Sequence, residues 1–299
     1  MFEGKNQIKE WLPSINEGEK ELISSALAFS LMTVCVKLLG GRIPVAEIVF
    51  IRAIISLVIT RVMLWRLKIS PWGKNKSLLL LRGSLGTAAL FCIFKALELL
   101  PLAPATILQY TYPTFTSIAA WIFLKEKLQK QIIAALLMGW IGITFVVEPS
   151  WITSNSNALP INAVLIALCG AILTAFAYIC VRKLSKVEHP LVIIHYFPFI
   201  SVPCTLPFVV SYGVFPTGFD WLWLMGIGIF TQLGQMGITK GLSLISASRA
   251  CSINYSQVLF ATLWGIIIFS EQISIFLSIG ALFILGATVI SVSNKPKIV

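Results

Sequence analysis

Residues 95–128 read KALELLPLAPATILQYTYPTFTSIAAWIFLKEKL, and residues 240–273 read KGLSLISASRACSINYSQVLFATLWGIIIFSEQI. The two stretches align without a gap at an offset of 145. The matched pairs are Lys95 and Lys240, Tyr110 and Tyr255, Glu126 and Glu271, and, farther upstream at an offset of 146, Pro44 and Pro190. Similarity at a fixed offset indicates that the chain consists of two copies of one structural unit.

The composition excludes an ordinary soluble domain. Of the 299 residues, 57% are hydrophobic and only 12% are charged, and the mean hydropathy is +0.89, whereas soluble domains carry about 25% charged residues. The formal net charge of +11 would suggest a nucleic-acid partner in a soluble protein. Here the basic residues lie between long apolar runs, where they report membrane orientation, so we expect the lipid bilayer and no nucleic acid as a partner.

Ten segments are long and apolar enough to cross a bilayer core of about 30 Å, which takes about 20 helical residues. The predicted spans are 21–39, 44–65, 78–99, 102–124, 131–147, 161–181, 191–210, 221–242, 247–269 and 274–292. They predict a cytoplasmic tail (1–19), a first five-helix repeat (20–149), an extracytoplasmic linker (150–160), a second five-helix repeat (161–293) and a second cytoplasmic tail (294–299).

The basic residues predict the orientation. With the N-terminus in the cytoplasm, the loops that carry most Lys and Arg lie inside and only Arg42 lies in an outer loop, which follows the positive-inside rule. Because five is odd, the second repeat must enter the membrane upside down, and the basic residues that flank Glu126 are indeed absent around Glu271. The predicted fold is an all-α protein of the cell inner membrane, with ten transmembrane helices in two inverted repeats and both termini cytoplasmic.

Several short motifs resemble the EamA module of the drug/metabolite transporter superfamily. The motifs are Arg82-Gly83, Ala96-Leu97, Pro101-Leu102-Ala103, Pro113, Leu124-Lys125-Glu126-Lys127, Gly139 and Gly142. The resemblance covers residues 22–293 and implies ten helices in two inverted repeats that move small metabolites, such as amino acids, nucleotide-like compounds or vitamins. The stretch AEIVFIR at 46–52 resembles a branch that includes S-adenosylmethionine uptake carriers. The second repeat departs from the pattern, with Val258 in place of Pro113.

Polar side chains at midplane depth are expected to face other helices or a wet cavity, because lipid offers them no partner. The strongest candidates recur in the fourth and ninth spans: Gln109, Tyr110, Tyr112, Asn254, Tyr255 and Gln257. Their amides and phenol rings can hydrogen-bond to and stack on a planar or zwitterionic solute. The alternative is that they join helices to one another. We predict a central solute site here, since inverted-repeat carriers bind between their halves.

Other polar residues are weaker candidates. Gln232 and Gln235 in the eighth span are either solute contacts or interhelical bonds. Arg52 is predicted to meet an anionic solute group, an acidic residue or a carbonyl, because Glu47, five residues away, is not placed to face it. The candidates for gating or charge relay are Glu47, Lys95 and Glu98, the last two forming a structural pair in the alternative reading.

Three further polar side chains are expected to have structural roles. Arg82 and Lys240 are expected to snorkel to the inner interface. His195 is expected to pack between helices, and a proton relay is the alternative.

Competing functions lack their usual signatures. The sequence contains no H-E-x-x-H, G-x-S-x-G or G-x-x-x-x-G-K-[ST] motif, so an intramembrane enzyme or an ATP-driven pump is disfavoured. The six cysteines fall in apolar runs without metal-ligand spacing, and no metal or cofactor is expected. A channel or receptor is the alternative to a carrier. The partners expected for a carrier are a small-molecule solute and a coupling ion, either a proton or another ion.

Overall fold

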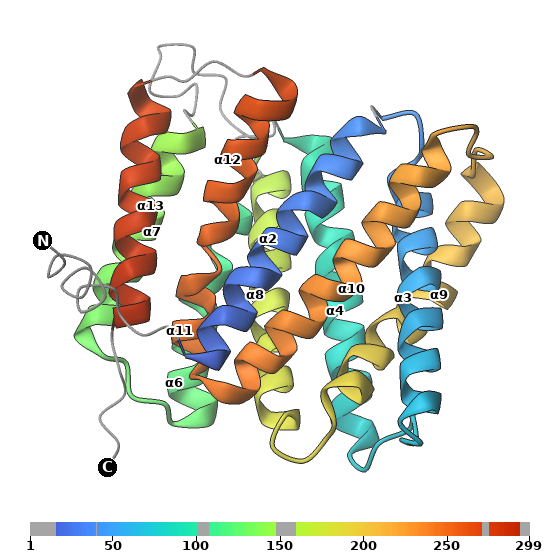
Figure 1. The fold of residues 1–299 in the computed structure, drawn as a ribbon, viewed down its shortest axis with the longest axis horizontal. Helices are drawn as coiled ribbons and strands as arrows, with labels where there is room; N and C mark the ends of the chain where they lie inside the picture. Colours follow the sequence, from blue (N-terminus) through green and yellow to red (C-terminus); the bar gives the residue numbers. More distant parts are fainter. Residues whose placement is uncertain (1–15, 40, 101–107, 148–159, 271–274, 294–299) are drawn as a thin grey trace, which may run out of the picture.

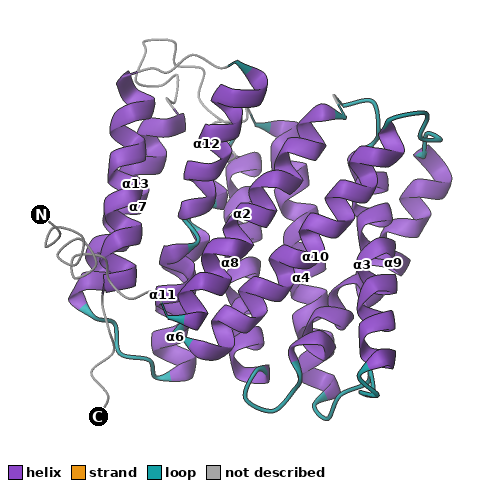
Figure 2. Cartoon of the chain, in the orientation of Figure 1, coloured by secondary structure: helices purple, strands orange, loops and turns teal. Residues whose placement is uncertain are grey.

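The computed structural model describes residues 16–39, 41–100, 108–147, 160–270 and 275–293. Within these residues every regular element is an α-helix, with no strand (Figure 2). The first half contains α2 (Glu17–Leu38), α3 (Val45–Arg66), α4 (Lys76–Leu99), α6 (Tyr112–Leu124) and α7 (Lys130–Val147). The second half contains α8 (Ile161–Leu184), α9 (Pro190–Tyr212), α10 (Asp220–Leu244), α11 (Ala247–Ile253), α12 (Ser256–Phe269) and α13 (Ile275–Ser293).

The helix bundle presents an apolar surface to its surroundings. Large apolar side chains on several helices are exposed, among them Val58, Trp121, Leu165 and Leu233, as expected where lipid is the solvent. Within the described residues, six helical segments are long and apolar enough to span a membrane, and further apolar helices are shorter. The chain is therefore an all-helical, multi-pass membrane protein, whereas the count of ten spans stays a prediction.

The contacts between helices repeat between the two halves. Helix α2 packs against α10, and its repeat mate α8 packs against α4. In the same way α6 contacts α8 while α12 contacts α2, and α4 contacts α9 while α10 contacts α3. Two pairs of repeat-related helices contact each other directly. Helices α7 and α13 form one edge of the bundle, and α3 and α9 form the opposite edge (Figure 1). Each half therefore makes the contacts of the other with the roles exchanged.

The fourth helix of each half is interrupted. The sequence predicts one span over residues 102–124 and one over residues 247–269. Residues 247–269 do form a segment long and apolar enough to span a membrane, whereas residues 102–107 lie outside the described structure. Turns at residues 110–111 and 254–255 interrupt the helix within the two predicted spans. Hydrogen bonds across both turns are tightened to three-residue spacing, such as Thr111 N–H to Leu108 O at 3.2 Å and Gln257 N–H to Asn254 O at 3.0 Å. Pro113 lacks an N–H for the residue four positions earlier, which accounts for the first interruption.

Helices α6 and α12 end in the same unusual way. Lys125 and Ser270, which occupy matching positions in the two repeats, both adopt a left-handed backbone with φ of 54°. Such a conformation is unfavourable for a residue with a side chain. Its recurrence at one repeat position shows that the two halves share local geometry as well as sequence.

The basic loops gather at one end of the bundle. The loops that follow α3, α6 and α8 lie together at the lower end in Figure 1, beside the start of α2. We call this the basic end; it carries Arg66, Lys68, Lys74, Lys125, Lys127 and Lys183. The opposite end holds the loop that contains Arg42 and the loop at 213–219. Basic residues therefore segregate as the sequence predicts, while the side of the membrane on which they lie stays a prediction.

Candidate functional site

Four tyrosines meet where the two interrupted helices face each other. The rings of Tyr110 and Tyr255 stack with centroids 6.4 Å apart and an interplanar angle of 28°. Tyr110 also lies 6.2 Å from Tyr112, whose ring meets Tyr178 of α8 edge-on at 5.6 Å. The repeat-related tyrosines of the two halves are thus in direct contact, and we refer to Tyr110, Tyr112, Tyr178 and Tyr255 as the tyrosine cluster.

Hydrogen-bonding capacity in this cluster is only partly used. The side-chain amide of Asn254 donates to the Tyr112 hydroxyl at 3.5 Å, the long limit of such a bond. Asn254 Oδ1 and the Tyr255 hydroxyl are buried and have no partner among the described residues. Gln109 and Gln257 stand at the two interruptions and are half-buried. Because buried polar atoms are almost always paired, this site can accept hydrogen bonds from, or donate them to, another molecule.

Tyr255 is nevertheless closed off in this conformation. Its side chain is fully buried and packs with apolar residues of α7, α12 and α13, such as Ile132, Val258 and Ile284. The ring lies so close to Gly139 that a Cβ there would come within 2.3 Å of it. A solute therefore reaches Tyr255 only after the helices that cover it separate.

Two arginines lie over one aromatic ring on the other side of the bundle core. The guanidinium carbons of Arg52 (α3) and Arg82 (α4) lie 5.5 and 5.2 Å from the ring centroid of Phe197 on α9. Arg52 is 9% exposed and Arg82 is 3% exposed. Arg82 Nη2 donates to Gln235 Oε1 at 3.3 Å, whereas the Nε atoms of both arginines have no partner in the described structure. We call Arg52, Arg82 and Phe197 the arginine pair site.

Arg82 does not snorkel, contrary to the expectation from the sequence. Its side chain turns into the bundle, where Gly86 leaves space for it one turn along α4. A Cβ on Gly86 would lie 2.7 Å from Arg82 Nη1 and 2.8 Å from the Phe197 ring. The missing side chain at Gly86 therefore gives the guanidinium room to pack inward.

Every carboxylate that the structure describes has a partner away from the arginine pair site. Glu19 pairs with Arg249, Glu126 with Arg182, Glu17 and Glu21 with Lys240, and Asp220 with Arg42. Glu47 accepts the N–H of Val214 at 2.8 Å, and Glu188 accepts the N–H groups of Lys74 and Asn75. Within the described residues, Arg52 and Arg82 are therefore buried cations without a carboxylate.

The arginine pair site and the tyrosine cluster are connected. Arg82 lies on α4, which packs against both α9 and α8, and Tyr178 of α8 contacts Tyr112. The packing of α3, α9, α4 and α8 therefore links the arginine pair site to the interruptions in the fourth helices.

The remaining predicted residues are placed less centrally. Gln232 accepts from the Ser56 hydroxyl and donates to Thr60 at 3.0 Å, so its amide joins α10 to α3. Glu47 is buried and ties α3 to the loop before α10, near the Arg42–Asp220 ion pair. Lys95 is exposed, and the Glu98 side chain lies outside the described structure, so their pairing stays a prediction. His195 is buried and stacks on Phe199 at 5.9 Å.

Tyr178, Phe197 and the inward role of Arg82 do not stand out in the sequence. Recurrence of polar residues at the repeat offset does not reveal them, because their mates are the apolar residues Met32, Ile51 and Ile227. The available signal is the charge at position 82, within an otherwise apolar run.

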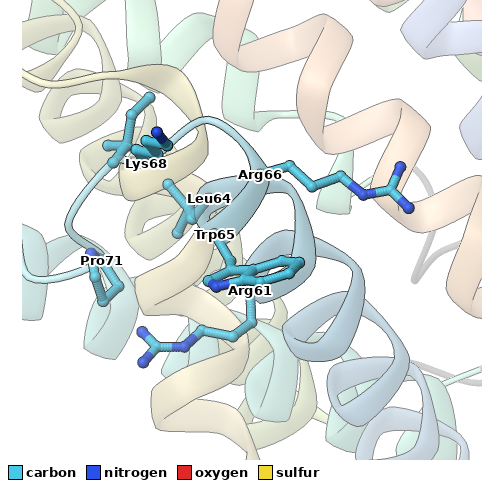
Figure 3. Close-up of a pocket in the computed structure, with 7 residues that line it drawn as sticks. Arg61, Leu64, Trp65, Arg66, Lys68 and Pro71 are labelled. Carbon is cyan, nitrogen blue, oxygen red and sulfur yellow. The ribbon is translucent and has the colours of Figure 1, made fainter.

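Two cavities lie at the basic end, away from these residues. One of about 580 Å³ is lined by Arg61, Trp65, Arg66, Lys68 and neighbouring apolar residues, and the side chains of Arg61 and Arg66 extend in opposite directions (Figure 3). The other, of about 360 Å³, is lined by Glu126, Arg182, Arg249 and, among others, residues 244–246 and 248. No cluster of three or more His, Cys, Asp or Glu within the described residues is arranged to hold a metal ion.

Comparison with known proteins agrees with this two-part architecture. The EamA-like transporter family matches residues 18–148 and again residues 161–293. The chain belongs to the EamA-like transporter family. This confirms membership in the drug/metabolite transporter superfamily, whereas the S-adenosylmethionine branch stays a prediction.

Relatives of this EamA-like protein are named as transporters. The chain is 29% identical over 261 residues to the pseudopaline exporter CntI of Pseudomonas aeruginosa, which covers 87% of this chain and 90% of the exporter. It is also 29% identical to solute carrier family 35 member G1 of Mus musculus, over 90% of this chain and 76% of the carrier. A crystal structure with 16% identity superposes with a TM-score of 0.81 over 93% of this chain and 96% of that one, which shows the shared fold. The EamA-like chain is thus a membrane transporter, and these names support a non-enzymatic role.

Proposed function

We propose that this protein is a secondary transporter that moves a small organic solute by alternating access. In this proposal the chain lies in the cell inner membrane and has ten transmembrane helices in two inverted five-helix repeats. Both of its termini are in the cytoplasm. The exchange of helix contacts between the halves supports the proposal. So do the paired interruptions in the fourth helices, because carriers of this kind form their solute sites at broken helices near the midplane.

The proposed solute site is the junction of the two interrupted helices. It comprises Gln109, Tyr110, Tyr112, Asn254, Tyr255 and Gln257, with Arg52 as a charged contact and Gln232 and Gln235 as further candidates. The observation that carries this assignment is the stacking of Tyr110 on Tyr255 beside the unpaired atoms Asn254 Oδ1 and Tyr255 hydroxyl. Such a junction suits a planar or zwitterionic metabolite, and amino acids, nucleotide-like compounds and S-adenosylmethionine are candidates.

Glu47, Lys95 and Glu98 are proposed as gating or charge-relay residues near the end opposite the basic end. The contact of Glu47 with Val214 supports a gating role, because it ties α3 to the loop that precedes α10. Opening of that end requires this contact and the Arg42–Asp220 ion pair to separate.

The direct test is exchange in liposomes. Purified protein is reconstituted in liposomes loaded with a metabolite mixture, and the solute that it retains or exchanges is identified by mass spectrometry. A carrier shows saturable counterflow, whereas a channel shows neither saturation at low concentration nor counterflow. Flux that never saturates for any solute would contradict the proposed function.

Variants of the junction locate the site. Gln109→Ala and Asn254→Ala each remove one hydrogen bond to the solute, about 1–3 kcal/mol, so affinity falls roughly five- to more than one-hundred-fold. Membrane insertion and monodispersity are unchanged. Ile118→Ala, at an exposed apolar position of α6, is the matched control and transports normally. Normal transport by both junction variants would show that these amides only join helices.

A further inference from the structure

Within the described residues, the arginine pair site holds two like charges that no carboxylate compensates. Arg52 and Arg82 are both buried and both lie over the ring of Phe197. Like charges brought together in a medium of low dielectric destabilise one another. Intramembrane arginines ordinarily pair with an acidic group or a backbone carbonyl, yet every described carboxylate is engaged elsewhere.

The protein supplies only partial neutralisation. Phe197 offers the face of its ring to both guanidiniums, and Gln235 offers one oxygen to Arg82. Neither group carries a negative charge, and both Nε donors remain unpaired within the described residues. The four helices that contribute these residues, α3, α4, α9 and α10, lie next to one another in the bundle (Figure 1). An anion bound between these helices would compensate both cations.

We propose that Arg52 and Arg82 act together as a two-point contact for a solute that carries two carboxylate groups, and this rests on the proposed transport function. Two carboxylates can give each guanidinium its own anionic partner. A phosphate carries about −1.5 to −2 charges on a single group, which the two arginines would have to share. The planar guanidinium fork matches a carboxylate in two parallel hydrogen bonds. Arg82 is thereby a second specificity-determining residue, and Phe197 positions the pair.

The test uses a series of dicarboxylates together with their half-amides. Malonate, succinate, glutarate and adipate, and the half-amide of each, are titrated at constant ionic strength against the purified full chain, and binding is measured from the shift in thermal unfolding midpoint. At least one dicarboxylate binds roughly tenfold or more tightly than its own half-amide, because one charge-assisted contact is lost in the half-amide. A series in which no dicarboxylate exceeds its half-amide overturns the proposal.

Substitutions assign this preference to the pair. Arg52→Gln and Arg82→Gln each lower the ratio of dicarboxylate affinity to half-amide affinity to about one. Arg82→Lys keeps part of this ratio, because the charge remains while the guanidinium fork is lost. Arg66→Gln, at an exposed arginine of the basic end, keeps the full ratio. An unchanged ratio in Arg82→Gln overturns the assignment. If a Gln variant is not recovered as monodisperse protein, the comparison in the unmodified chain decides alone.

Two further readouts distinguish a solute contact from a structural role of the arginines. Without ligand, Arg52→Gln does not lower the unfolding midpoint, since it removes an uncompensated buried charge; a marked decrease would show that Arg52 has a structural role and contradict the proposal. In liposomes, the protein could exchange another solute saturably while dicarboxylates do not compete. That result would support the carrier function and contradict the proposed dicarboxylate contact at Arg52 and Arg82. Absence of any saturable exchange overturns both.

Discussion

At the scale of single residues, the contact between Gly139 and Tyr255 decides how firmly the junction is held. Gly139 lies on α7, and its hydrogen occupies the space where a Cβ would lie 2.3 Å from Cε2 of Tyr255. The ring of Tyr255 is fully buried, and Tyr110 stacks on it from the other half. The junction therefore depends on a close approach that only glycine permits.

We predict that Gly139→Ala destabilises the protein by about 1–3 kcal/mol, because the buried ring and its neighbours must shift to admit a methyl group. Gly286→Ala on α13 is the matched control. Its Cβ meets only the flexible end of Met138, so the effect is smaller. Thermal unfolding of the purified variants in one detergent measures both, and equal midpoints would contradict the tight packing at Tyr255.

Single residues also mark how far the sequence alone predicts the site. Tyr110 and Tyr255 can be found because they recur at the repeat offset, and the structure brings them into contact. For Arg82 the sequence predicts a side chain at the membrane–water interface, because an arginine near a helix end ordinarily reaches water. The space beside Gly86 reverses that outcome. Such space arises from the packing of α4 on α9, which a linear pattern does not encode.

At the scale of elements, the left-handed ends of α6 and α12 carry a prediction. Lys125 and Ser270 each adopt φ of 54°, where glycine is the usual helix-ending residue. Lys125→Gly and Ser270→Gly therefore each stabilise the protein, by about 1 kcal/mol, because relief of an unfavourable backbone exceeds the entropy lost by glycine.

The control for this pair is Lys127→Gly, two residues beyond the helix end. Lys127 is exposed and has no positive φ, so glycine there leaves stability unchanged or slightly lowers it. Urea or thermal unfolding midpoints decide the comparison. Stabilisation at only one of the two repeat positions would contradict the equivalence of the two helix ends.

Of the two interruptions within the fourth helices, the sequence gives a reason for only the first. Pro113 gives a reason for the first interruption, but Val258 stands at the corresponding place in the second, and the turn at residues 254–255 still forms. Local propensity does not require that turn. The turn lies where Asn254 and Tyr255 are both buried among neighbouring helices, so we expect tertiary packing to set it.

At the scale of the whole molecule, the internal repeat predicts most of the architecture. The offset of 145 links residues far apart in sequence, and helix contacts repeat between the halves as that offset implies. The all-helical fold and the clustering of basic loops follow from composition and charge pattern. How each polar group is partnered could not be predicted, because partners such as Phe197 and Gln235 come from other helices.

Opposite orientation of the two repeats is the central claim, and cysteine labelling of corresponding loops tests it most directly. Two variants are made in a chain that lacks the six native cysteines. One carries Ser70→Cys and the other Phe215→Cys, so each has a single thiol at an exposed position, in the loop before α4 or before α10. We predict that an impermeant thiol reagent added to intact cells labels position 215 alone, and that both positions react after permeabilisation. Labelling of both positions from the same side of the membrane would contradict the inverted repeat.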